Sequence, residues 1–165
     1  VVTPELPVFL DAILADDPVQ FEARRVALAR AAVAPEISRE QRLAAARRLA
    51  RRLIETGRPI EAATELKLLG ATADSPLGDD LFEALLLAEA WEDAAGIRPD
   101  AEVWVNFLEG RIIAEPAIAK LILAEIDRRF GGQLKDPQIV TVEAARGVLV
   151  DAAPGSERDS IGGDA

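Results

Sequence analysis

The stretch SREQRLAAARRLARRLIETGRPIEAATELKLLG, residues 38–70, contains two helix patterns separated by a Gly-Arg-Pro turn. Ser38 and Gln41 have the spacing of a capping box, in which the serine oxygen accepts a backbone amide and the glutamine reaches back, so a helix starts here. Gly57 suits the left-handed position after a helix end, and Pro59 suits the first turn of the next helix. Because so short a turn leaves no other arrangement, we expect two antiparallel neighbouring helices.

The first of these two helices is amphipathic. Its apolar residues fall on one arc, namely Leu43, Ala46, Leu49, Ala50, Leu53 and Ile54. Four arginines occupy the opposite side, namely Arg47, Arg48, Arg51 and Arg52. In the second helix, which ends at Gly70, the expected buried stripe consists of Ile60, Ala63, Leu66 and Leu69. The stretch therefore predicts a packed helix pair with a basic outer face.

Helix signals continue along the rest of the chain, and strand signals are few. Apolar spacing, first-turn prolines, polar caps and glycine stops predict further helices over residues 6–14, 18–33, 79–96, 99–112 and 117–130. Asp79 or Asp80 is the expected cap of the helix over 79–96. Residues 137–150 contain β-branched side chains, but we favour a helix because an isolated hairpin would have no sheet to join. We expect an all-α fold of about seven or eight antiparallel helices, as a helical-hairpin array or an irregular bundle.

The chain has 165 residues, which is the size of one domain that can bury a core without disulfides or metals. We predict a single all-helical domain over residues 1–153, with the loop 71–78 as the best internal boundary and a flexible polar tail over 154–165. The absence of cysteine leaves the compartment open, since a cytosol and a periplasm both suit such a chain. No apolar run approaches the ~18 residues of a membrane helix, so we expect no membrane insertion.

Charge is distributed unevenly along the sequence. Residues 24–67 contain eleven basic and five acidic side chains, whereas residues 74–115 contain eleven acidic and two basic ones. The formal net charge of −10 repels nucleic acid, yet a local basic face can still meet a negative partner. The alternative is that the arginines face acidic neighbours of the same chain or water.

Residues suited to catalysis or cofactor binding are scarce. The chain has no histidine and no cysteine, so the usual general base and the most reactive nucleophile are missing. Zinc lacks its preferred nitrogen and sulfur ligands, and no Gly-rich phosphate loop follows a strand. Three carboxylate pairs could bind a hard cation or act as acid and base, namely Asp16-Asp17, Asp79-Asp80 and Glu92-Asp93. Helix capping explains the first two, and we expect no enzymatic activity, no cofactor and no metal.

A family resemblance lies within residues 46–70. The pattern Leu49-Ala50, Leu53, Gly57, Glu61-Ala62 and Leu66 is similar to the tetratricopeptide repeat, in which small residues let paired helices approach closely. The stretch Trp91-Glu92-Asp93-Ala94-Ala95 then repeats Pro59-Ile60-Glu61-Ala62-Ala63 after 32 residues, near the period of that family. The chain departs from the family pattern at 96–99, which interrupt the second helix of the repeat, and at Asp74, where the family has a proline.

The resemblance implies a groove that binds a peptide or a subunit and is lined by the first helix of each pair. Its exposed residues would be Arg47, Arg48, Arg51 and Arg52, and guanidinium groups suit an acidic segment through a planar fork of donors. The alternative is that these arginines pair with Glu55, Glu61, Glu65 or the acidic half of the same chain, as exposed pairs of little energetic weight.

An aromatic stripe is the second candidate surface. Trp104 and Phe107 recur at helical spacing with Leu108 and Ile112. Packing in the core is one explanation. If Trp104 and Phe107 are exposed, they become interface anchors, because large rigid aromatics dominate binding energy at protein contacts.

These observations favour a noncatalytic adaptor or scaffold that binds another protein or an acidic peptide through helix-pair surfaces. Its Ala- and Arg-rich composition is typical of bacterial-type assemblies. A second hypothesis is a structural subunit whose apolar faces are covered by partner chains. A third is a nucleic-acid binder that uses the Arg-rich helix, and the net negative charge argues against it.

Overall fold

The computed structural model describes residues 18–151 and, within them, the side chains of residues 20–150. Every regular element in this range is a helix, which confirms the all-α fold class. The antiparallel arrangement of neighbouring helices stays a prediction. The helix expected over 6–14 and the polar tail expected over 154–165 lie outside the described residues.

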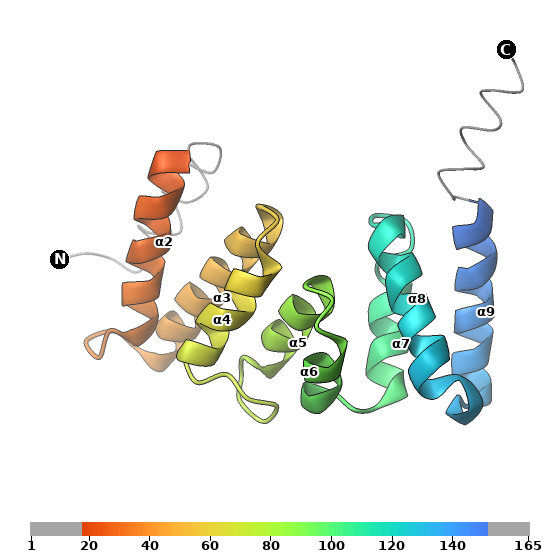
Figure 1. The fold of residues 1–165 in the computed structure, drawn as a ribbon. Helices are drawn as coiled ribbons and strands as arrows, with labels where there is room; N and C mark the ends of the chain where they lie inside the picture. Colours follow the sequence, from red (N-terminus) through yellow and green to blue (C-terminus); the bar gives the residue numbers. More distant parts are fainter. Residues whose placement is uncertain (1–17, 152–165) are drawn as a thin grey trace, which may run out of the picture. The chain divides into compact units, whose positions relative to one another are not determined.

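Contacts divide the chain into two compact units, with the division between Ile97 and Arg98. The loop 71–78, which the sequence suggests as an internal boundary, lies within the first unit. In the described part of this unit the helices are α2 (Pro18–Val33), α3 (Arg39–Glu55), α4 (Pro59–Leu68), α5 (Gly78–Leu87) and α6 (Trp91–Ile97). Each packs against the next one along the chain, and α3 also contacts α5 (Figure 1).

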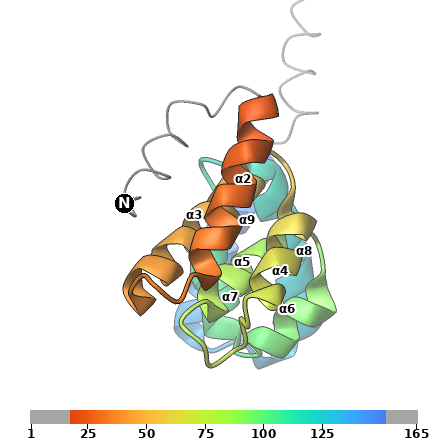
Figure 2. The same ribbon diagram turned by 90° about the vertical axis from the view of Figure 1, so that its left-hand side faces the viewer.

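Helix α3 begins as the sequence predicts. The Ser38 hydroxyl accepts a hydrogen bond from the Gln41 backbone amide at 3.2 Å, and the Gln41 side chain accepts one from the Ser38 amide at 3.2 Å. This reciprocal pair is the predicted capping box. Ion pairs join α2 to α4, because the Arg25 guanidinium lies 3.2 Å from Glu65 and 3.6 Å from Glu61. Figure 2 shows α2 in front, with α3 and α4 on either side of it in this view.

Three turns of the first unit share one geometry, with positive φ angles at Gly57, Gly70 and Glu89. The turns at Gly57 and Glu89 each join two helices and lie 32 residues apart. Gly57 between α3 and α4 and Glu89 between α5 and α6 both have positive φ angles, of 78° and 59°. Their hydrogen bonds correspond one to one: Gly57 N to Ile54 O at 3.0 Å and Arg58 N to Leu53 O at 2.8 Å, against Glu89 N to Leu86 O at 3.0 Å and Ala90 N to Leu85 O at 2.9 Å. Both turns close the preceding helix with a left-handed residue.

The turn at Glu89 corrects the helix expected over 79–96, which is in fact the two helices α5 and α6. No glycine or proline lies at the break, and the apolar spacing typical of a helix continues across it. The sequence therefore predicts one helix where the structure has two. The expected cap is also wrong: α5 begins at Gly78, so Asp79 and Asp80 lie in its first turn, and no side chain caps it.

The core of the first unit is formed by leucines and small residues. Leu53, Ala62 and Leu66 are completely buried between α3, α4 and α5. The predicted stripe on α4 is wrong at its start, because the side chain of Ile60 is 67% exposed. A helix turns by about 100° per residue, so a stripe built on steps of three drifts. Ile60 therefore lies on the side of α4 opposite to Leu69.

The second unit is described over residues 98–151. Its helices are α7 (Ala101–Glu109), α8 (Pro116–Phe130) and α9 (Asp136–Asp151), with a short 3-10 helix η1 (Gly131–Gln133) after α8. Each of the three long helices packs against the other two. Residues 137–150 are therefore helical, as favoured from the sequence.

Candidate functional site

The four arginines of α3 lie on two flanks of the helix, because a step of four residues returns to nearly the same side. Arg47 and Arg51 face α5. The Arg47 Nε atom lies 3.2 Å from Asp80, and its Nη2 donates to the Pro76 carbonyl at 2.8 Å. Arg51 donates two hydrogen bonds to the Glu83 carboxylate, at 2.9 and 3.3 Å.

The Arg51–Glu83 pair is the better shielded of these two bridges. The Glu83 side chain is only 13% exposed. Hydrogen bonding to Glu83 raises the pKa of Arg51 above its usual range, against the opposing effect of partial burial. Bidentate geometry is the strongest arrangement for an arginine and a carboxylate. These two arginines hold α3 against α5, and their guanidinium groups are occupied within the unit.

The other flank carries Arg48 and Arg52. Arg52 lies 2.5 Å from Glu55 on the same helix. Arg48 is half-buried and makes no hydrogen bond or ion pair with any described residue. Three of the four predicted arginines therefore follow the alternative of pairing within the chain, with Glu55 and with the acidic half. Glu61 and Glu65 pair with Arg25 instead.

Several cations of the first unit have no carboxylate within ion-pair distance among the described residues. They are Arg24, Arg30, Arg39, Arg42, Arg48 and Lys67. All but Lys67 lie on α2 and α3. The excess of positive charge on α2 and α3 is thus only partly neutralised in the folded unit, because the carboxylates of α5 pair with Arg47 and Arg51 alone among these arginines.

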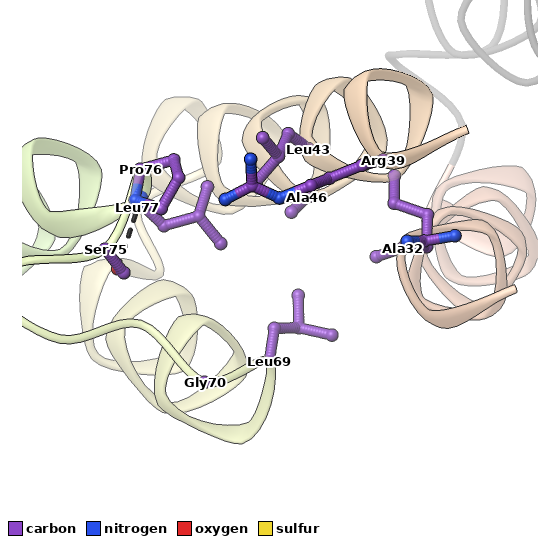
Figure 3. Close-up of a pocket in the computed structure, with 10 residues that line it drawn as sticks. Ala32, Arg39, Leu43, Ala46, Leu69, Gly70, Ser75, Pro76 and Leu77 are labelled. Atoms are coloured by element: carbon purple, nitrogen blue, oxygen red, sulfur yellow. Dashed lines mark hydrogen bonds between the residues drawn. The ribbon is translucent and has the colours of Figure 1, made fainter. Parts of the chain in front are cut away.

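A pocket of about 250 Å³ opens beside the first turns of α3. Helix α3 has 17 residues and α4 has 10, so α4 is shorter by about 10 Å. Leu69 and Gly70, which follow α4, reach the pocket beside the first turns of α3. The pocket is lined by Ala32, Arg39, Arg42, Leu43, Ala46, Leu69, Gly70, Ser75, Pro76 and Leu77 (Figure 3).

Two arginines border this apolar pocket. The Arg42 Nη1 atom donates to the carbonyls of Ile37 at 2.7 Å and Ala34 at 3.2 Å, which fixes the guanidinium beside the end of α2. Arg39 is exposed, and Figure 3 shows its side chain running along the pocket toward Leu43. The sequence reasoning missed both residues. The unequal length of the two helix patterns was the signal that could have found them.

The loop between α4 and α5 closes one end of the pocket. The Ser75 hydroxyl accepts hydrogen bonds from the amides of Thr72 at 2.9 Å and Leu77 at 3.3 Å, and donates to the Thr72 carbonyl at 3.0 Å. These bonds fold the loop back on itself and place Pro76 and Leu77 at the pocket wall (Figure 3).

The predicted aromatic surface belongs mainly to the core of the second unit. Trp104 is 0% exposed, donates from its indole nitrogen to the Arg98 carbonyl at 2.8 Å, and packs edge-on against Phe130. Phe107 is half-buried, with the Arg111 guanidinium 4.2 Å from its ring centre. Trp104 is therefore not accessible to a partner protein in this structure. Its prediction as a partner-binding residue is wrong, and packing in the core explains it instead.

Other features bear on function only weakly. Within the described residues, no group of three or more carboxylates is arranged to hold a metal ion. No helix between residues 18 and 151 combines the length and the apolar character needed to cross a membrane. Comparison with protein-family models, curated proteins and solved structures gives no match to this chain.

Proposed function

We propose that this chain is a noncatalytic protein-interaction module whose first unit binds an acidic segment of a partner protein across α2 and α3. One observation carries the proposal: five arginines on these two helices have no carboxylate partner among the described residues. Guanidinium groups are well suited to carboxylates. The paired turns at Gly57 and Glu89 support the further proposal that the unit is related to tetratricopeptide-like helix pairs.

Charge reversal tests the proposal. Proteins captured by the full chain from its source cell are identified by mass spectrometry, and their acidic segments are made as labelled peptides. The variant Arg30→Glu/Arg48→Glu should weaken peptide binding at least tenfold, because two donors become repulsive. The control Lys120→Glu/Lys135→Glu makes the same change of net charge on exposed lysines of the second unit and should leave affinity within about twofold.

The same titration separates the proposal from nucleic-acid binding. A labelled DNA duplex and a labelled single strand are titrated beside the peptides at two salt concentrations. Tight, steeply salt-dependent binding to either nucleic acid, with no binding to the acidic peptides, would contradict the proposal. Equal peptide binding by both double variants would contradict the place of the site on α2 and α3.

A structural subunit is the second candidate function, and helix α9 favours it. Its inner face buries Val142, Ala145 and Leu149, yet Val140 on the outer side is 69% exposed and Val148 is also exposed. Ala144 between them is also exposed, and residues four apart lie along one side of a helix, so these three side chains form an apolar stripe. Exposed apolar surface marks contact sites on many proteins. If a partner chain covers it, Val140→Lys/Val148→Lys should stay folded and lose that partner in co-purification. Retention of every partner would reject this candidate.

A further inference from the structure

The pocket beside the start of α3 suggests how an acidic segment would be read. Its floor is apolar, because Ala32, Leu43, Ala46, Leu69 and Leu77 contribute to the wall. Its volume of about 250 Å³ lies just below the range of about 300–1,000 Å³ that is typical of small-molecule sites. The size suits one side chain of a peptide better than a cofactor.

Charge at the rim selects the occupant. Arg39 and Arg42 are the charged residues in the pocket wall, and neither has a carboxylate partner among the described residues. Arg42 is held through Nη1 by two backbone carbonyls, so its other nitrogens are oriented before any ligand arrives. A ligand that places an apolar group in the pocket and a carboxylate at the rim would match both the apolar wall and the two arginines.

We propose that this pocket binds a single apolar side chain of an acidic protein segment, with a neighbouring Asp or Glu carboxylate of that segment held by Arg39 and Arg42. The inference rests on the proposed function and deepens it, because it names the residue pattern of the partner. The recognised motif is an apolar residue of about leucine size next to a carboxylate.

Peptide selection tests the motif while the partner protein is still unidentified. Random 12-residue peptides displayed on phage are selected against the immobilised full chain, and the enriched sequences are made as labelled peptides. Their dissociation constants are measured by fluorescence anisotropy. The enriched peptides should share a Leu, Ile, Val or Phe beside Asp or Glu, and replacing that apolar residue by Ala should weaken binding by about ten- to a hundredfold.

Two variants of the pocket make the test specific. Arg39→Glu should weaken binding at least tenfold by replacing a donor with a like charge. Ala32→Leu should weaken it similarly by filling the pocket. Their controls are Lys120→Glu, which makes the same charge change on an exposed residue of the second unit, and Ala44→Leu, which adds the same bulk to an exposed position of α3 outside the pocket. Circular dichroism confirms that each variant is folded.

The outcomes separate the inference from the proposed function. Loss of binding in both pocket variants, with both controls unchanged, supports the pocket motif. Acidic peptides that bind both pocket variants as tightly as the original chain, but lose affinity for Arg30→Glu/Arg48→Glu, overturn the pocket and leave the proposed function standing. Failure to enrich acidic peptides at all overturns both.

Discussion

The helix pairs α3–α4 and α5–α6 share a turn but differ in the residue at its tightest point. That residue is Gly57 in the first pair and Glu89 in the second, and both have positive φ. A left-handed conformation costs a residue with a side chain about 1–2 kcal/mol relative to glycine. The second pair therefore keeps the geometry without the residue that favours it, so contacts elsewhere must fix the turn.

The contacts that fix the turn at Glu89 are those of the buried side chains on either side of it. Four buried residues of the first pair have a buried counterpart 32 residues later, namely Ala46 and Gly78, Leu49 and Leu81, Leu53 and Leu85, and Ala62 and Ala94. Small residues stand where two helices approach, and leucines fill the space between them. These four core positions and the two turn hydrogen bonds are thus common to both pairs, and the identity of the left-handed residue is not.

Outer surfaces differ more than cores. Helix α3 presents arginines and α5 presents Asp80 and Glu83, so the second pair neutralises the flank of the first that faces it. On the other flank, Arg52 pairs with Glu55 of the same helix, and Arg48 has no carboxylate partner among the described residues. The same backbone unit therefore supplies a structural bridge on one side and candidate binding groups on the other.

The largest expected effect comes from a charge in the shared core. Leu53→Asp and Leu85→Asp should each destabilise the first unit by at least about 4 kcal/mol, because a cavity and a buried charge add. Leu68→Asp on α4 is the control, since Leu68 is 75% exposed, and should change stability by less than about 0.5 kcal/mol. Urea unfolding followed by circular dichroism measures all three. Normal folding of Leu85→Asp beside unfolding of Leu53→Asp would break the equivalence of the two pairs.

The first pair was predictable from the sequence because its signals are local. Ser38 and Gln41 form the expected capping box, Gly57 has the expected left-handed conformation, and Pro59 starts α4. The break at Glu89 was missed because nothing at that position signals a helix end. The 32-residue repeat aligns Trp91 with Pro59, which begins α4, and α6 does begin at Trp91. The repeat therefore indicated a helix start that the spacing of apolar residues did not show.

The candidate site was less predictable, since it depends on which groups folding brings together. Helix spacing placed the four arginines on the outside of α3, but it could not show that Asp80 and Glu83 lie within reach of Arg47 and Arg51. Spacing also could not distinguish a buried Trp104 from an exposed one. The pocket at Arg39 combines residues of α2, α3 and the segment after α4, and the unequal length of the two helix patterns was a signal for it that helix spacing alone did not use.

The turns themselves are the next test of the comparison. Gly57→Ala should destabilise the first unit by about 1 kcal/mol, because alanine is strained at a positive φ. Steric clash should add nothing to this value, since a Cβ at Gly57 meets no atom within 4 Å. Glu89→Gly should stabilise it or leave it unchanged, since relief of strain is offset by the greater freedom of the unfolded chain. Gly96→Ala in α6, where the backbone is helical, is the control and should stabilise by about 0.5–1 kcal/mol. Destabilisation by Glu89→Gly would show that the Glu89 side chain contributes to the turn.

A smaller effect belongs to the bridge between the pairs. A double-mutant cycle on Arg51→Ala and Glu83→Ala should give a coupling energy of about 0.5–1 kcal/mol that decreases with salt. The Arg47–Asp80 pair, joined by one hydrogen bond between the side chains, should give less. Thermal unfolding at low and high salt measures both cycles. A coupling energy near zero for Arg51 and Glu83 would show that apolar packing alone holds α3 to α5.

The smallest expected effect extends the comparison to the second unit, where Arg146 of α9 makes a bidentate pair with Asp127 of α8 at 2.8 and 3.0 Å. The hydrogen bond from Arg146 lowers the pKa of Asp127 below its ordinary value. A carboxylate with a lowered folded pKa stabilises the fold above its unfolded pKa of about 3.9, and loses that contribution as pH falls through the folded pKa. Both side chains are about 40% exposed, so the stabilisation should be only a few tenths of a kcal/mol.

NMR titration of the Asp127 carboxyl should show the low pKa in the original chain and a return to its ordinary value in Arg146→Gln. If Arg146→Gln leaves that pKa unchanged, the pair is a contact without energetic weight, and the two units differ in how their helices are joined.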